Sequence, residues 1–377
     1  MKELLELAAA RRRVEKETVA IATVLRVDGS SYRRVGARML VGASGRMAGS
    51  VSGGCLEAGV EIEAQAAIRD GRDRLLVFDT TVPGDVIFGS GLGCQGKIWI
   101  GIEVLPAGKA WPLAKVVERV RRTRVPVAWV TRVVEGERGI RFDAIGTEQD
   151  GEDDNLIFLP ASWRAAITEV FATARSQFVD HDGCEPVLVE WLGPPLALLA
   201  FGGGPDLPPL VNLAAQLGHE VTVIDRRPEV AKPENFSAAH RVLAAAPSRV
   251  RSLVRADELT VAVIMNHHYE TDREVLAALL PLGLPYIALL GPQRRTARIL
   301  DELRERGIET PATLLDALHG PAGLDIGAED PTQIALSILA EIQATLANRP
   351  GGKLKFRSAP IHADAVKPEC VPCALPA

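Results

Sequence analysis

LALLAFGGGPDLPPLVNLAAQLGHEVTVIDRRP, residues 196–228, carries the strongest structural signal in the chain. A short apolar run ends in three glycines, a helical pattern follows, and a second apolar run ends at Asp225. Apolar runs without polar alternation are typical of strands that are covered on both faces of a parallel sheet. A strand, a glycine turn, a helix and an acidic strand end predict the first βαβ unit of a Rossmann-like fold.

The same rhythm continues beyond this unit. Further strands are expected at 260–265 and 286–290, with helices at 206–217, 272–280 and 294–306. A last helix begins where Asp330 suits the N-cap and Gln333 completes a capping box. We therefore predict a doubly wound parallel sheet over 196–347 and a loose tail over 348–377.

Residues 1–195 predict a separate α/β domain whose middle, from about residue 106, is less regular. Strand-like and helical patterns alternate in it, and Pro194-Pro195 marks the boundary with the second domain. The expected strands are 19–27, 38–41, 75–78, 98–104, 125–134 and 187–191, and the expected helices are 1–17, 55–68 and 162–175. The acidic segment 148–155 is expected to be a solvated turn.

The composition of the chain restricts the classes of protein to which it can belong. The 377 residues are 47% hydrophobic and 24% charged, as in ordinary globular proteins. A formal charge of −5 argues against a non-specific nucleic-acid binder, which needs a basic field. No run reaches the roughly 18 apolar residues of a membrane span. Five cysteines are too few for a disulfide framework, so we expect a cytoplasmic protein.

The glycine turn is the first candidate binding site. Gly202, Gly203 and Gly204 lie where a phosphate-binding turn belongs, and Asp225, 23 residues after Gly202, matches an acidic residue that holds a ribose hydroxyl. Arg226 follows it and suits a 2′-phosphate or a plain surface position.

A standard nicotinamide site is disfavoured at this turn. Three prolines near the helix start carry no N–H, Leu207 replaces a small residue, and Asp206 brings a negative charge. Two alternatives stay open: glycines that only make a turn, and a nucleotide or pterin-phosphate ligand.

Other loops lie at the carboxyl ends of the predicted strands or before a helix, where open α/β sheets bind ligands. Each single residue in them also suits a solvated loop. The candidates in these loops are His267, Gly291, Arg294, Arg295 and Asp325.

The first domain has two further candidate loops. Residues 29–38 combine hydroxyls, arginines and glycines, which can wrap an anion; the candidates are Ser30, Ser31, Arg33, Arg34 and Arg38. Residues 49–57 add Ser52, Gly53, Gly54 and Cys55. Because Cys55 lies at a predicted helix start, the helix dipole there favours a thiolate.

Cys94 lies in a second glycine loop. Buried small hydrophobes are the plain alternative for Cys55 and Cys94, and the position of each inside a glycine loop of one domain favours a functional role. Neither loop has the paired cysteines of a zinc site. The tail pair Cys370 and Cys373 has CxxC spacing but, with His362, is one ligand short.

Together these motifs resemble the XdhC/CoxI family of maturation factors for xanthine dehydrogenase, CO dehydrogenase and related molybdenum hydroxylases. The resembling segments are GSSYRRVGARMLV (29–41), GSVSGGCLE (49–57), FGSGLGCQG (88–96), FGGGPDLPPL (201–210), VTVIDRRP (221–228), YIALLGPQRR (286–295) and PAGLDIGAEDPTQIALSILAEI (321–342). One departure is Asn266, which stands where a threonine is expected before His267.

The resemblance implies an N-terminal XdhC/CoxI domain, a C-terminal Rossmann-like domain and binding of the molybdenum cofactor, molybdopterin or its dinucleotide form. It implies a chaperone that protects the cofactor while a cysteine desulfurase supplies sulfur, and then inserts it into an apo molybdenum hydroxylase. A homodimer is also expected. Under this interpretation Cys55 and Cys94 are candidate contacts to molybdenum or carriers of sulfur.

Three rival functions remain. The first is an NAD(P)-dependent oxidoreductase that uses the Rossmann domain. The second is a catalytic xanthine dehydrogenase subunit, which is disfavoured because the four-cysteine spacings of iron–sulfur clusters are absent from the sequence. The third is a docking protein without a small ligand.

Overall fold

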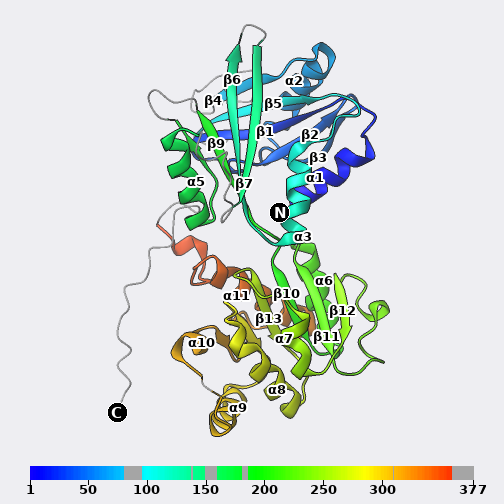
Figure 1. Cartoon of the computed structure of the whole chain (residues 1–377), viewed down its shortest axis with the longest axis vertical. Helices are drawn as coiled ribbons and strands as arrows, with labels where there is room; N and C mark the ends of the chain where they lie inside the picture. Colours follow the sequence, from blue (N-terminus) through cyan, green and yellow to red (C-terminus); the bar gives the residue numbers. More distant parts are fainter. Residues whose placement is uncertain (80–95, 137–138, 149–158, 181–185, 309, 359–377) are drawn as a thin grey trace. The chain divides into compact units, whose positions relative to one another are not determined.

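The computed structural model describes residues 1–79, 96–136, 139–148, 159–180, 186–308 and 310–358. The chain forms two compact units, Met1–Pro194 and Pro195–Ala377, divided at the Pro194-Pro195 pair (Figure 1). Among the described residues, no helix has both the length and the apolar character needed to cross a membrane.

A five-stranded antiparallel sheet, in the order β3-β2-β1-β5-β4, forms the centre of the first unit. Its strands are β1 (Val19–Gly29), β2 (Arg38–Gly42), β3 (Gly45–Gly49), β4 (Arg74–Asp79) and β5 (Gly96–Leu105). Helix α2 (Glu57–Asp70) packs on one face through residues such as Val60 and Ala64. On the other face lies α1 (Lys2–Arg13), with Leu7 in the core.

A smaller antiparallel sheet, β7-β6-β9-β8, completes this unit. Its strands are β6 (Val127–Gly136), β7 (Gly139–Glu148), β8 (Gln177–Val179) and β9 (Val187–Leu192). Helix α5 (Ala161–Thr173) covers one of its faces with Trp163 and Ile167. Helix α3 (Pro112–Thr123) joins the core that α1 forms, because Leu113 and Val117 pack there.

The second unit contains a six-stranded sheet in the order β12-β11-β10-β13-β14-β15, and every neighbouring pair is parallel. In chain order these strands are β10 (Ala197–Phe201), β11 (Glu220–Asp225), β12 (Arg241–Ala244), β13 (Thr260–Ile264), β14 (Ile287–Leu289) and β15 (Leu318–His319). This is the 3-2-1-4-5-6 order of dinucleotide-binding folds, so the predicted doubly wound sheet is confirmed.

Helices cover both faces of this sheet. Helices α6 (Leu207–Gln216) and α11 (Pro331–Leu346) share one core with β10, while α7 (Val250–Leu253), α8 (Tyr269–Leu279) and α9 (Gln293–Glu305) share the other. The remaining short elements are α10 (Ala312–Asp316) and the 3₁₀ helices η1 (Pro233–Asn235), η2 (Pro247–Arg249), η3 (Leu280–Leu282) and η4 (Leu354–Phe356). The predicted capping box is present at Asp330 and Gln333.

All expected strands of both units are present, and so are the expected helices. The predictions missed α3, α7, α10 and the strands β3, β7, β8, β12 and β15. The helix expected from residue 55 begins at Glu57. Residues 149–158 and 359–377, which contain most of the acidic segment and the Cys370–Cys373 pair, lie outside the described residues.

Candidate functional site

The carboxyl ends of β10 and β13 form the point at which the strand order reverses in the second unit, which is where such folds bind ligands. The loops after these two strands are in direct contact. Gly202 has a φ of +126°, and a Cβ at this position would lie 2.5 Å from the carbonyl oxygen of Met265. Only glycine allows the chain to pass here.

The next two glycines leave bare backbone beside Asp225. A Cβ on Gly203 would lie 2.0 Å from Val230 Cγ1 and 3.0 Å from Asp225 Oδ2. Neither the Gly203 nor the Gly204 amide donates a hydrogen bond within the part of the chain that is described. Both N–H groups are therefore available to an anion. Leu207, which stands in place of the small residue of a standard nicotinamide site, is fully buried at the start of α6.

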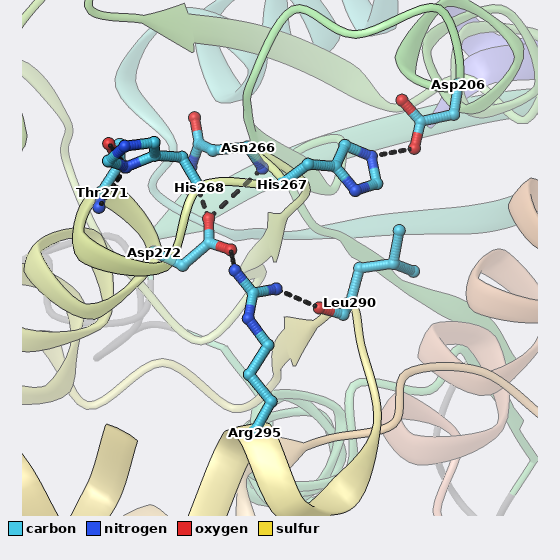
Figure 2. A network of polar contacts seen from close by, with 8 residues as sticks. All are labelled: Asp206, Asn266, His267, His268, Thr271, Asp272, Leu290 and Arg295. Carbon is cyan, nitrogen blue, oxygen red and sulfur yellow. Dashed lines mark hydrogen bonds and ion pairs between the residues drawn. The ribbon is translucent and has the colours of Figure 1, made fainter. Parts of the chain in front are cut away.

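A carboxylate and an imidazole bridge the loops after β10 and β13. His267 Nε2 lies 2.6 Å from Asp206 Oδ2. Figure 2 shows the two side chains pointing toward each other. The His267 side chain is 55% exposed, and its backbone has a φ of +55°. The other oxygen of Asp206, Oδ1, is buried without a hydrogen-bond partner. His267 therefore projects to the reversal point, where Asp206 places the negative charge that the sequence suggested.

Asp272 at the start of α8 ties the β13 and β14 loops together (Figure 2). Its side chain is 1% exposed and accepts hydrogen bonds from Asn266 Nδ2 at 2.9 Å and from Arg295 Nη2 at 2.6 Å. Arg295 Nη1 also donates to the Leu290 carbonyl at 3.0 Å. Arg295, expected to bind an anion, instead supports the loops from within.

The other arginine of this pair has a different environment. Arg294 is exposed and forms no hydrogen bond or ion pair with any described residue. Gly291 has a φ of +129°, and a Cβ there would lie 3.2 Å from Arg295 Cδ. Gly291 therefore allows the loop to pass over the Arg295 side chain, while Arg294 stays at the surface.

Asp225 is also paired within the protein. Arg227 donates to its two carboxylate oxygens, from Nε at 3.0 Å and from Nη2 at 2.8 Å, and Asp225 is 3% exposed. Burial alone would raise the pKa of Asp225, but these hydrogen bonds outweigh it and lower the pKa. The carboxylate expected to bind a ribose hydroxyl is therefore occupied. Arg226 is exposed beside it.

Asp325 is exposed on the loop that follows β15. This loop is attached to α11: the Gly323 amide donates to Glu341 Oε2 at 2.7 Å, and Ser337 Oγ donates to the Leu324 carbonyl at 2.6 Å. The attachment fixes the loop that carries Asp325.

In the first unit, two predicted loops meet at Tyr32 and Gly53. A Cβ on Gly53 would lie 3.2 Å from Tyr32 Cγ, so the tyrosine ring covers the glycine backbone. The ring is otherwise open, because Tyr32 is 70% exposed. Cys55 carries a free, exposed thiol in the same loop as Gly53. The alternative of a buried, inert cysteine is therefore wrong for Cys55.

The start of the 29–38 loop lies against the amino end of β5. A Cβ on Gly96 would lie 2.4 Å from the Ser30 carbonyl oxygen. The hydroxyls of Ser30 and Ser31 form no hydrogen bond with described residues. Cys94 precedes Gly96 by two positions and lies outside the described residues.

Ser52 and Gly54 shape the second loop. The Ser52 hydroxyl donates to Glu57 and accepts from the amides of Gly54 and Leu56 at 3.2 and 3.0 Å. Burial alone would raise the pKa of the Glu57 carboxyl, but the hydrogen bonds from Ser52 and nearby amides lower it overall. Ser52 therefore fixes the start of α2, and the residues left at the surface are Gly53, Gly54 and Cys55.

Two of the three predicted arginines serve the fold. Arg38 forms a two-pronged ion pair with Glu190, at 2.7 and 2.5 Å, and both side chains are 4% exposed. Arg33 forms a similar pair with Glu3 of α1. These contacts correct the predicted role of Arg38 and Arg33 in anion binding, because their guanidinium N–H groups donate to carboxylates of the protein itself. Arg34 is exposed and has a contact within the protein.

Sequence reasoning did not select Tyr32, Glu57, Asn266 or Asp272 as site-forming residues. Tyr32 lies in the segment 29–41, where an aromatic ring among serines and glycines could have indicated a site residue. The partner of Glu57 is Ser52, five positions away in the quoted motif 49–57, so this contact had a local signal. The contact of Asp272 with Arg295, 23 positions away, follows from the fold. In the described part of the chain, no group of three or more His, Cys, Asp or Glu residues is arranged to hold a metal ion.

These features define a two-part α/β protein. An antiparallel unit with an exposed thiol loop is followed by a Rossmann-type unit in which Asp206 and His267 bridge the loops after β10 and β13. The XdhC and CoxI family matches residues 13–79, and the XdhC Rossmann domain matches residues 198–342. A probable xanthine dehydrogenase subunit of Bacillus subtilis (strain 168) is 31% identical over 332 residues, which cover 88% of this chain and 94% of that protein. The chain belongs to the XdhC and CoxI family.

Other similar proteins support this assignment. The molybdenum cofactor insertion chaperone PaoD of Escherichia coli (strain K12) is 26% identical, over 85% of this chain and 81% of its own length. The uncharacterized protein YqeB of the same organism is 32% identical over half of this chain and 32% of its own length. A crystal structure of a xanthine dehydrogenase from Bacillus halodurans has a TM-score of 0.72 and 29% identity, and the match covers 92% of this chain and 96% of that one.

Proposed function

We propose that this protein is a molybdenum cofactor chaperone. It binds the cofactor, protects it while a cysteine desulfurase supplies the terminal sulfur, and inserts it into an apo hydroxylase of the xanthine dehydrogenase or CO dehydrogenase type. Membership of the XdhC and CoxI family supports this role, as does the similarity to a protein named a molybdenum cofactor insertion chaperone. The structural observation that carries it is the exposed Cys55 thiol beside the Tyr32–Gly53 contact.

The first-unit loops suit an anionic pterin that carries a phosphate. The hydroxyls of Ser30 and Ser31 and the amide of Gly53 have no partner among the described residues, so they can donate to phosphate oxygens. The exposed Tyr32 ring offers a flat surface on which an aromatic pterin can stack. Cys55 supplies a soft sulfur ligand that can approach molybdenum or carry sulfur.

The second unit offers further donors for an anion. The Gly203 and Gly204 amides are available, and the exposed Arg226 and Arg294 add positive charge. These groups fit a phosphate of the cofactor or of its dinucleotide form. The Gly202 turn, His267, Asp225 and Asp325 then shape the surrounding edge of the sheet.

Cofactor retention tests the proposal. The protein is purified from a host that makes the cofactor, and the pterin released by denaturation is oxidised and measured by fluorescence. We expect pterin in the wild-type protein and at least about ten-fold less in Cys55→Ala, because loss of even an outer-shell contact of a metal site typically lowers affinity by this factor. Ser44→Ala, an exposed position in the β2–β3 turn, is the matched control and should retain wild-type amounts. Pterin-free wild-type protein that also transfers nothing to an apo hydroxylase rules the proposal out.

A second assay separates binding from sulfur transfer. Cofactor-loaded protein is mixed with an apo hydroxylase, with and without a cysteine desulfurase and cysteine. We expect the hydroxylase to become active only when the desulfurase is present. Cys55→Ser should lower transfer of sulfur-bearing cofactor more than it lowers pterin content, if the thiol carries sulfur. An equal decrease in pterin content and in transfer would show that Cys55 binds the cofactor and does not carry sulfur.

The alternative function is an NAD(P)-dependent oxidoreductase. The strand order of the second unit and its available glycine amides favour it. Asp206 at the start of α6 and the prolines beside it disfavour it, because they remove donors and add negative charge. Micromolar binding of NADH or NADPH by calorimetry, together with turnover, would establish this alternative.

The remaining parts of the proposal concern cellular context. We propose a cytoplasmic protein, because five sparse cysteines suit a reducing compartment. We also propose a homodimer, which light scattering coupled to size-exclusion chromatography measures directly. A monomer at all concentrations removes this part without affecting the cofactor role.

A further inference from the structure

A basic groove runs between α1 and α3 in the first unit, and none of its lining residues belongs to the loops 29–38 and 49–57. Its volume is about 480 Å³. The residues that line it are Ala8, Arg11, Arg12, Glu15, Lys109, Ala110, Trp111, Ala114, Lys115, Glu118, Arg119 and Arg122. Neither the fold nor the proposed cofactor role requires a groove at this position.

Small and apolar side chains form the floor of the groove. Ala8 and Trp111 are 1% and 4% exposed, and Ala110 and Ala114 lie beside them. The guanidinium of Arg11 is fixed below by the carbonyl oxygens of Val14, Pro106 and Lys109, at 2.8, 3.2 and 2.8 Å. Nη1 and Nη2 of Arg11 are therefore already hydrogen-bonded within the protein, while its Nε is buried without a hydrogen-bond partner among the described residues.

The rim is strongly basic. Six lining residues are cationic and two are acidic, although the whole chain has a formal charge of −5. Four of the six cations, Arg12, Lys109, Lys115 and Arg122, are exposed. A concentration of positive charge on an otherwise acidic protein attracts negatively charged partners and raises their association rate.

We propose that the α1–α3 groove docks an acidic amphipathic segment of a partner protein. Apolar side chains of the segment rest on the alanine and tryptophan floor, and its carboxylates face the rim cations, as in other helix-in-groove complexes. A small-molecule site would need buried polar groups that converge on the ligand. Here Arg11 Nε is a single buried donor without a partner in the described part of the chain, while Nη1 and Nη2 of Arg11 donate to carbonyl oxygens of their own chain. Four of the other five cations are long exposed side chains, and Arg119 is half-buried.

A second copy of this chain is a poorer occupant. In a two-fold symmetric contact the same patch faces itself, so the basic rims would oppose each other. Like charges placed face to face across an interface are unfavourable. The charge of the groove therefore favours a different, acidic protein.

The probe is a fluorescein-labelled synthetic helix with leucines at helical spacing on one face and glutamates elsewhere. Binding to the full-length protein is measured by fluorescence anisotropy, next to a peptide in which lysines replace the glutamates. We expect micromolar binding of the acidic peptide only. We also expect binding to weaken at least about ten-fold when NaCl rises from about 0.05 M to about 0.5 M.

Two kinds of variant locate the contact. Arg12→Glu with Lys115→Glu reverses charge on the two helices of the rim and should weaken acidic-peptide binding at least about ten-fold. Ala114→Phe keeps every charge but fills the floor, and should weaken binding through shape alone. The matched control is Arg13→Glu with Lys16→Glu, which makes the same change in net charge at exposed positions that do not line the groove. Circular dichroism confirms that each variant is folded.

The outcomes are decisive in both directions. Binding that the groove variants weaken and the control pair preserves supports the proposal. Equal binding by all variants, no binding by the wild type, or equal binding of the lysine peptide overturns it. Concentration-dependent self-association that Ala114→Phe abolishes also overturns it, because the occupant is then a second copy. Inorganic pyrophosphate that displaces the peptide at micromolar concentration assigns the groove to a small anion and likewise overturns it.

Discussion

His267 Nε2 and Asp206 Oδ2 lie 2.6 Å apart and join the loops that follow β10 and β13. In a Rossmann-type sheet this position, where the strand order reverses, is the entrance for the phosphates of a dinucleotide. A carboxylate therefore occupies the amino end of α6, which in dinucleotide-binding proteins attracts a phosphate. The loops at this edge of the sheet have the backbone arrangement of a nucleotide site but carry a different charge.

Asp206→Asn should increase the affinity of the glycine turn after β10 for anions. The substitution removes one negative charge near the available Gly203 and Gly204 amides and preserves the shape of the side chain. We expect pyrophosphate to bind several-fold to about ten-fold more tightly than to the wild type, measured by calorimetry. Asp301→Asn removes a similar charge from the exposed surface of α9 and serves as the control. Equal affinities for wild type and Asp206→Asn would show that the carboxylate does not guard the turn.

Asp272→Ala should destabilise the second unit by about 3 kcal/mol. The carboxylate accepts from Asn266 and Arg295, and its loss leaves a largely buried guanidinium without its anion. Arg294→Ala, at the adjacent exposed position, should change the free energy of unfolding by less than about 0.5 kcal/mol. Urea unfolding followed by circular dichroism measures both.

Tryptophan fluorescence provides an internal reference for that experiment. All five tryptophans, Trp99, Trp111, Trp129, Trp163 and Trp191, belong to the first unit. Their unfolding transition should therefore stay at the wild-type urea concentration in Asp272→Ala. A variant with wild-type stability by both signals would contradict the role assigned to Asp272.

The second unit could be predicted well from the sequence because its signals are local. Apolar runs of strand length, glycines after β10 and the capping box at Asp330 each indicate structure within a few residues. Strand β12 was missed because it is four residues long and half exposed at the sheet edge, which gives it no apolar run. The convergence of loops on one edge followed directly from the parallel order.

The roles of Arg38 and Arg295 could not be predicted, because they depend on residues far away in the chain. Arg38 and Glu190 are separated by 152 positions, and Arg295 and Asp272 by 23. A local pattern of serines and arginines predicts an anion site equally well whether or not an internal carboxylate takes the arginine. Cys55, in contrast to these arginines, could be interpreted from its short glycine-rich motif alone, because its exposure agrees with the functional role that the motif predicts.

Variants of Arg38 and Glu190 test whether Arg38 stabilises the fold or binds the cofactor. Glu190→Ala leaves a buried guanidinium without its partner and should cost about 3–5 kcal/mol. The double variant Arg38→Met with Glu190→Leu replaces the pair by apolar groups and should recover most of that loss. Tryptophan fluorescence during urea unfolding reports on this unit alone.

The same double variant decides whether Arg38 also binds the cofactor. We expect the folded double variant to retain wild-type amounts of pterin, since the guanidinium of Arg38 is 4% exposed and faces Glu190. A stable double variant that has lost its pterin would show that Arg38 does bind the cofactor.

Glu103 should make the first unit less stable as pH rises. Its side chain lines a cavity of about 100 Å³ together with Thr23, Arg38 and Thr131. Burial, assisted by repulsion from Asp73 and opposed by Arg38, raises the pKa of Glu103 to about 7 from an ordinary value of 4.5. The folded state therefore binds the Glu103 proton more tightly than the unfolded state does.

The sign and the pH range follow from this difference. The contribution of protonated Glu103 is fully present below about pH 4.5, declines as pH rises, and is lost above about pH 7. The total change is at most on the order of 3 kcal/mol. Glu103→Gln should remove this decline and be more stable than wild type at pH 8, as followed by tryptophan fluorescence during urea unfolding. Glu17→Gln, at an exposed position, should keep the wild-type profile. A Glu103→Gln profile parallel to that of wild type would show that Glu103 ionises in the folded protein as it does in water.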